Sequence, residues 1–224
     1  MDNNLRVLVD LRDRVLQKNR IAFGLREGAI ERGADQSGNG NSALFERWQE
    51  RFYMLEKEAD KDIKELAGDI PIIQEMVKVR GVGYLLAAKV AAMIDIERAT
   101  TVSALWRYAG YAVVNGQREK LTKGEKAHYN RRLKIACRLI GESFLKSNSP
   151  YRSIYDSAKE YYAANRTDWT LLHQHNAALG KMIKVWLQHL WVIWREMEGL
   201  DIKDLYVMEH LGHTHYLKPE DFGW

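Results

Sequence analysis

An all-α fold is predicted for this chain, and two observations predict it. Only three prolines occur among its 224 residues, at Pro71, Pro150 and Pro219. The long intervals between them carry helix-forming residues whose apolar members recur at spacings of three and four, as in amphipathic helices. We therefore expect an N-terminal antiparallel helical hairpin at 1–69, a helical domain at 70–199 and a C-terminal tail at 200–224.

The predicted hairpin consists of two helices with apolar seams. The seam of the first helix is expected at Leu8, Leu11, Val15, Lys18, Ala22, Leu25 and Ala29. A stretch rich in turn residues follows at 33–42. The seam of the second helix is expected at Leu44, Trp48, Phe52, Leu55, Ala59, Ile63 and Leu66. Because two helices bury little apolar surface alone, we expect this arm to pair with the body of the protein or to form a homodimer.

The predicted helical domain begins with two short helices joined by Arg80-Gly81-Val82-Gly83. Glycines permit positive φ and leave bare backbone, so the amides of such a bend and of the helix after it can converge on a phosphate oxygen. This pattern predicts a helix-hairpin-helix that binds nucleic-acid backbone without choosing a sequence. The alternative is a structural corner whose glycines only allow two helices to pack closely.

Positive charge is concentrated in the middle of the chain. Lys and Arg exceed Asp and Glu between residues 71 and 150, whereas both flanking stretches carry a small acidic excess. Most of the basic residues lie between Asn115 and Arg138, first in a predicted loop and then on one side of an amphipathic helix. A polyanion responds to such a local field, so nucleic acid is the expected partner. A solvated helix face or a contact with an acidic protein would need the same charges.

Three motifs in this region together resemble a known family. They are Arg80-Gly81-Val82-Gly83, then Leu105-Trp106-Arg107-Tyr108-Ala109-Gly110-Tyr111, then Asn130-Arg131-Arg132-Leu133-Lys134. Their order is similar to that in the C-terminal transposase domain of the insertion-sequence transposases that combine a RuvC-like domain with a serine domain. The resemblance runs from about residue 70 to 199, and the hairpin before it is similar to the coiled-coil arm of that family.

This resemblance implies a DNA-binding function linked to transposition or recombination. No RuvC-like segment with acidic metal ligands precedes the hairpin, and Asn115 stands where the family presents its serine, so we expect no catalytic residue and no cofactor. The alternative is a catalytic subunit, with Ser103 or Ser143 as nucleophile, that works with a separate nuclease chain. The expected partners are duplex or branched DNA, with RNA as a further candidate. The expected DNA-binding residues are Arg80, Gly81, Val82, Gly83, Lys89, Arg118, Lys120, Lys123, Arg131 and Arg132.

Composition excludes several other classes of protein. Cys137 is the single cysteine, so neither an intramolecular disulfide nor a cysteine-rich zinc cluster can form. No apolar stretch approaches the roughly 18 residues of a membrane span, and the N-terminus lacks the pattern of a signal peptide. We therefore expect a cytoplasmic, nucleoid-associated protein of bacterial or phage origin without membrane partners.

Two groups of side chains near the C-terminus have a structural and a functional interpretation. Helical spacing of Met182, Trp186, Leu190 and Trp194 predicts core packing rather than a platform for unpaired bases. The cluster His210, His213 and His215 has the spacing of metal ligands, but it lies in a segment with turn residues. We expect no metal there.

Overall fold

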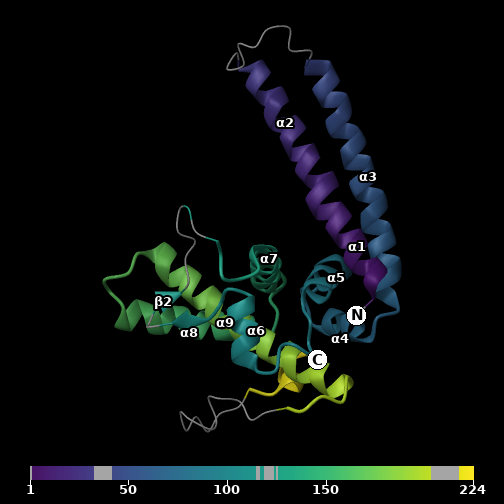
Figure 1. Cartoon of the computed structure of the whole chain (residues 1–224). Helices are drawn as coiled ribbons and strands as arrows, with labels where there is room; N and C mark the ends of the chain where they lie inside the picture. Colours follow the sequence, from purple (N-terminus) through teal and green to yellow (C-terminus); the bar gives the residue numbers. More distant parts are fainter. Residues whose placement is uncertain (1, 33–41, 115–116, 119–123, 125, 203–216) are drawn as a thin grey trace. The chain divides into compact units, whose positions relative to one another are not determined.

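The computed structural model describes residues 2–32, 42–114, 117–118, 124, 126–202 and 217–224 (Figure 1). The described residues are helical apart from short connections and one two-residue strand pair, which confirms the all-α prediction. The chain divides into two compact units, Met1–Ile70 and Pro71–Trp224. In the part that the structure describes, no helix is long and apolar enough to cross a membrane.

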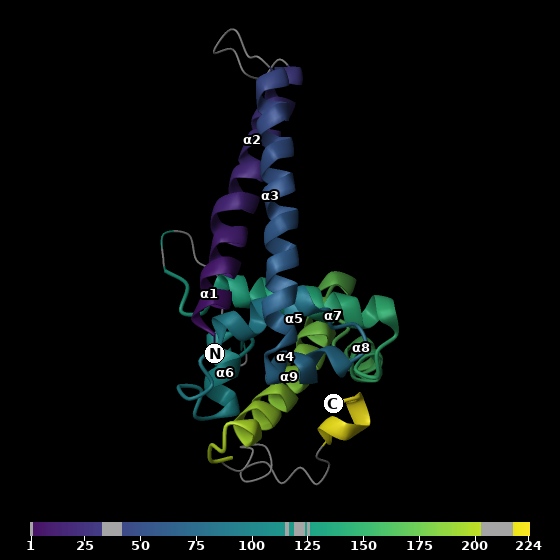
Figure 2. The ribbon, with the colours of Figure 1, turned by 90° about the vertical axis from the view of Figure 1, so that its right-hand side faces the viewer.

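The first unit is a pair of antiparallel helical rods (Figure 2). One rod consists of α1 (Asn3–Asp10), a π-helical turn (Leu11–Leu16) and α2 (Gln17–Glu31), and the other is α3 (Ser42–Gly68). Asp2 caps α1 by accepting a hydrogen bond from the Asn4 amide at 2.7 Å. Near the tip of the hairpin, the ring of Phe23 lies 5.6 to 6.3 Å from the rings of Phe45, Trp48 and Phe52. These rings hold the end of the rods together.

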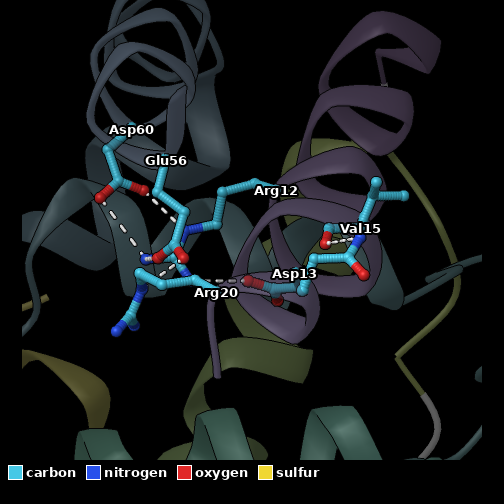
Figure 3. A network of polar contacts seen from close by, with 7 residues as sticks. Arg12, Asp13, Val15, Arg20, Glu56 and Asp60 are labelled. Atoms are coloured by element: carbon cyan, nitrogen blue, oxygen red, sulfur yellow. Dashed lines mark hydrogen bonds and ion pairs between the residues drawn. The ribbon is translucent and has the colours of Figure 1, made fainter. Parts of the chain in front are cut away.

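A buried ionic network joins the two rods (Figure 3). Arg12, whose exposed fraction is only 8%, donates from Nε to Asp60 at 2.8 Å and lies 3.5 Å from Glu56. Arg20 donates to the other oxygen of Glu56 at 2.7 Å. Burial opposes the charged form, but hydrogen bonds and the charges of Asp60 and Asp13 raise the pKa of Arg12. The guanidinium is therefore charged, and the carboxylates of Asp13, Glu56 and Asp60 balance its charge.

The predicted seam of the first rod is wrong because of this network. Leu11 and Leu25, expected to face α3, are 42% and 68% exposed. The buried side chains instead include Leu5, Val9, Arg12 and Leu16, which are also spaced by three and four residues. On α3, Ala59 and Ile63 are buried as predicted, but Glu56 takes the seam position expected for Leu55. A purely apolar template cannot select a seam that contains paired charges.

The second unit is built around the long helix α9 (Leu171–Met197). The helices that contact α9 are α4 (Pro71–Lys78), α6 (Val102–Tyr108), α7 (Arg131–Ser147) and α8 (Arg152–Asn165), while α5 (Tyr84–Met93) packs on α4 and α7. The strands β1 (Val113–Val114) and β2 (Gln117–Arg118) form an antiparallel pair in which Val113 faces Arg118 and Val114 faces Gln117. Helix α7 therefore lies between α5 and the central helix.

Aromatic residues of α9 form the core of this unit, as predicted. Met182, Trp186, Leu190 and Trp194 are all buried. Trp191 is buried too, and its Nε1 donates to the Ala99 carbonyl oxygen at 2.6 Å, which ties the segment after α5 to α9. Full burial of an aromatic side chain stabilises a fold by several kcal/mol, about 3 to 5 by truncation to alanine. This core therefore holds the surrounding helices in place.

The last residues of the chain also belong to the second unit. A short 3₁₀ helix, Pro219–Phe222, places the Phe222 ring 4.6 Å from the ring of Tyr151 and 5.2 Å from that of His189. Trp224 Nε1 donates to the Tyr151 hydroxyl at 2.6 Å. The segment 217–224 is therefore packed structure rather than part of a free tail, whereas His210, His213 and His215 lie outside the described residues.

Candidate nucleic-acid interface

The bend between α4 and α5 has the geometry of a tight turn that only glycine can close. The Val82 amide donates to the Val79 carbonyl oxygen at 3.0 Å, and Gly81 has φ of +101°. A Cβ at Gly81 would lie 2.6 Å from Ser147 Oγ. The hydroxyl of Ser143 donates to the Gly81 carbonyl oxygen at 2.7 Å. Backbone conformation and close contact with α7 thus both require glycine at this position.

The second glycine of the bend is open to the surroundings. Gly83 is exposed, and no atom lies within 4 Å of the place where its Cβ would be. It is the N-cap residue of α5 and supplies no side-chain cap, so the first amides of that helix lack an intrahelical acceptor. Val82 is buried and anchors the bend, while Arg80, just before it, is exposed. The bend thus carries both accessible bare backbone, at Gly83, and an exposed cation, at Arg80.

The amino end of α7 carries the described part of the predicted basic segment. Asn130 caps the helix, since its side-chain oxygen accepts hydrogen bonds from the amides of Arg132 and Leu133 at 3.1 Å. Arg131 is exposed and Arg132 is half-buried. Lys134 lies over the ring of Tyr129, with Nζ 4.2 Å from its centre. Of these three cations in the first turns of α7, Arg131 is the exposed one.

The bend and these arginines contact different parts of α7. Gly81 meets the helix at Ser143 and Ser147, whereas Arg132 lies eleven residues before Ser143, which corresponds to about 17 Å along the axis. Eleven residues are close to three full turns, so Arg132 shares the helix face of Ser143, while Arg131 is roughly a third of a turn away. The structure therefore places the two predicted contacts far apart, at a distance that about five base pairs of duplex would span.

The other predicted DNA-binding residues are less informative. Lys89 is half-buried on α5. Arg118 lies in β2, where the structure describes its backbone only. Lys120 and Lys123 lie outside the described residues, as does Asn115. The basic loop expected from the sequence thus contributes no side-chain geometry to the site.

A cavity beside the bend adds residues that sequence reasoning missed. It has a volume of about 470 Å³, and its lining includes Lys78 and Arg80 from around the bend and Asn148, Ser149, Arg152 and Asp156 from the end of α7 and the start of α8. Lys78 and Arg152 are 74 positions apart, and tertiary packing brings them together, with α5 on α7 and both α4 and α8 on α9. Pro150, three residues after the end of α7, is the local signal that a second helix begins nearby.

The two serines that the sequence offers as nucleophiles, Ser103 and Ser143, lack a basic partner in the described part of the chain. Ser103 is exposed in the first turn of α6, and neither it nor Ser143 has a basic partner among the described residues. Cys137 is buried, and burial raises the pKa of its thiol, which disfavours the reactive thiolate. Residues 2–32, 42–114 and the later described ranges hold no group of three His, Cys, Asp or Glu side chains that could bind a metal ion.

Comparison with known proteins gives no independent assignment. No protein-family model, no curated protein and no solved structure matches this chain. The function is therefore argued from the geometry of the site and from the motifs of the sequence.

Proposed function

We propose that this chain is a DNA-binding protein, related to the transposase domain that it resembles, and that it holds duplex or branched DNA by the phosphate backbone in transposition or recombination. The observation that carries the proposal is the open surface at the bend. Exposed Gly83, uncapped first-turn amides of α5 and the exposed Arg80 are together suited to a phosphate oxygen. No base-reading side chain is needed for such a contact, so the expected sequence preference is weak.

The lack of a partner for the Arg80 side chain among the described residues favours DNA binding over the alternative that the bend serves only to pack two helices. Its guanidinium has no hydrogen-bond or ion-pair partner in the described part of the chain, whereas most other arginines nearby are engaged. Arg138, for example, donates to Glu142 at 2.8 Å and to Asn176 at 3.2 Å. A glycine corner needed only for packing would be explained by Gly81 alone. It would not account for an open Gly83 beside an unengaged cation.

The structure also sharpens the experiment that tests this function. Substitution of Gly81 would disturb the fold, since its Cβ would meet Ser147 and its φ is positive. Gly83→Val avoids both problems because φ is −99° and the surroundings are empty. In anisotropy titrations with duplex and four-way-junction DNA, we expect Gly83→Val to lower the affinity about tenfold by blocking approach of the phosphate.

A matched control is available on α3. Gly68 is likewise open, with nothing within 4 Å of its Cβ position. Gly68→Val should bind DNA like the wild type. Affinity of Gly83→Val within twofold of the wild type, at unchanged helicity, would contradict the proposed role of the bend.

We further propose that the first unit mediates homodimerisation. Val7, Leu11 and Val15 follow each other at intervals of four residues and are all exposed, as is Leu25 on α2. Of these side chains, Leu11, Val15 and Leu25 were expected in the interior of the hairpin. Sedimentation equilibrium should show a dimer for the wild type and a monomer for Leu11→Glu. A monomeric wild type at tens of micromolar would reject the dimer.

A further inference from the structure

We propose that the cavity beside the bend is a binding site for a phosphate monoester, carried either by the end of a DNA strand or by a free nucleotide. The cavity lies wholly within the second unit, between the end of α4, the bend, the end of α7 and the start of α8. Its volume of about 470 Å³ falls in the usual range of small-ligand sites, roughly 300 to 1,000 Å³. A phosphate and the sugar that carries it would both fit.

The charge of the lining favours a compact anion. Lys78, Arg80 and Arg152 contribute three cations, and Asp156 contributes one carboxylate. A guanidinium can donate two parallel hydrogen bonds to phosphate oxygens, which makes arginine well suited to this ligand. Arg80 and Arg152, from different segments of the cavity lining, are therefore suited to bind different oxygens of one phosphate.

The cations that already have partners hold them weakly. Lys78 lies 2.6 Å from Glu75, but this is an exposed pair on the surface of α4, and such pairs contribute little. Arg152 lies 3.4 Å from Asp156 and donates to the Leu145 carbonyl oxygen at 3.3 Å, both long contacts. Arg80 has no partner among the residues that the structure describes. All three side chains can therefore turn to a ligand at small cost.

A buried hydroxyl in the cavity wall provides an independent indication. Ser149 is only 3% exposed, and its Oγ has no hydrogen-bond partner in the structure. A buried polar group left unsatisfied costs about 1 to 3 kcal/mol, so such groups in native proteins commonly have a partner. Rotation about the Cα–Cβ bond would let this hydroxyl donate to a bound phosphate. Adjacent Asn148, in the left-handed conformation with φ of +54°, adds an exposed amide to the same wall.

The test uses the full chain and two kinds of probe. Calorimetry with deoxythymidine 5′-monophosphate, with thymidine as the uncharged comparison, measures the site without DNA. Anisotropy with a single-stranded oligonucleotide that carries either a 5′-phosphate or a 5′-hydroxyl measures binding of a strand end. We expect the monophosphate to bind and thymidine not to bind. If the strand end is the natural source, the phosphorylated oligonucleotide should bind more tightly than its hydroxyl counterpart.

Two variants and one control locate the ligand. Arg152→Gln should weaken monophosphate binding about tenfold, since it removes a charge-assisted pair of hydrogen bonds. Ser149→Ala should weaken it several-fold and leave folding intact, because the hydroxyl has no partner to lose. Arg166→Gln makes the same charge change at the far end of α8, where Arg166 lies over Trp169, and should leave binding unchanged.

Each outcome bears on the site in a defined way. Monophosphate binding that Arg152→Gln weakens and Arg166→Gln does not supports the site, and a preference for the phosphorylated end then identifies DNA as the source. Monophosphate binding without that preference supports a free nucleotide. Monophosphate binding in a protein that binds no DNA would overturn the proposed function and leave this inference standing, since it rests on that function only for DNA ends. If the protein binds no monophosphate and shows no preference for the phosphorylated end, the inference is overturned.

Discussion

The two ends of α7 both contact a glycine turn, yet the turns are built differently. At the carboxyl end, Gly81 packs on Ser143 and Ser147 while its neighbour Gly83 stays open. At the amino end, Gly110 is buried with φ of +74°, and a Cβ there would lie 2.7 Å from the ring of Tyr129. The amino-end turn is thus closed by packing, whereas the carboxyl-end turn leaves backbone, a cation and a cavity accessible.

Hydrogen bonds also hold the glycine turn at the amino end of α7 in place. Asn130 donates from its side-chain amide to the Tyr108 hydroxyl at 2.9 Å, and Tyr108 in turn donates to the Met93 carbonyl oxygen at 3.0 Å. The Tyr111 hydroxyl donates to the Lys134 carbonyl oxygen at 3.1 Å. The second and third motifs of the sequence are therefore joined to each other by direct contacts. We infer that these contacting residues are needed for structure, whereas exposed Arg131 and the residues of the bend are available for binding.

The largest expected effect is a difference in the free energy of unfolding that is lost on substitution at the two ends of α7. Gly110→Ala should lower the free energy of unfolding by about 2 to 4 kcal/mol, because it combines a strained positive φ with overpacking against Tyr129. At the other end, Ser143→Ala removes only one hydrogen bond to Gly81 and should cost about 1 kcal/mol. Urea denaturation of both variants measures the difference. Equal losses would show that the ends are packed alike.

A second effect depends on pH and concerns the C-terminal segment, whose Phe222 and Gly223 line the cavity near the bend. Burial lowers the pKa of His189 to about 4, although the Leu217 carbonyl and the charges of Glu220 and Asp221 oppose the shift. Its Nε2 lies 2.8 Å from that carbonyl oxygen and therefore donates to it, while Nδ1 lies 2.5 Å from the Tyr151 hydroxyl and accepts from it. Neutral imidazole fits these partners.

Because the folded state binds the proton less readily than the unfolded state, stability due to His189 is fully present above pH 6.5. It is lost as the pH falls toward 4, by about 3 kcal/mol in total. Denaturation at pH 7 and pH 4 should therefore show a larger drop for the wild type than for His189→Gln. If the two proteins show the same pH dependence, His189 is not a buried neutral histidine that packs on the C-terminal segment.

Local patterns predicted the elements of this fold more reliably than the faces they use. The helical class and the buried run Met182, Trp186, Leu190 and Trp194 follow from spacing, because one continuous apolar stripe decides the orientation of α9. The wrong face of the first rod was predicted because Arg12 and Arg20 occupy positions in the seam. These arginines can be buried there because they pair with Glu56, which is more than thirty residues away and cannot be recognised from the local sequence.

Only the local features of the candidate site could be predicted from the sequence. Positive φ at Gly81 and exposure of Arg80 could be anticipated from a glycine bend. The distance between this bend and Arg131 depends on where α5 meets α7, which is a tertiary contact. The cavity likewise combines Lys78 with Arg152 through packing alone. The concentration of charge predicted DNA contacts in the loop at 115–123, and the structure describes none of the side chains of that loop.

The central claim is that the bend and the amino end of α7 hold the same DNA, and the salt dependence of duplex affinity tests it most directly. Each phosphate contact contributes about −0.9 to the slope of log K against log salt. Between 50 and 200 mM salt, roughly the range over which such contacts are measured, Arg80→Gln and Arg131→Gln should each flatten the slope by about 0.9, and the double variant by about 1.8. A slope that Arg80→Gln leaves unchanged would contradict the account.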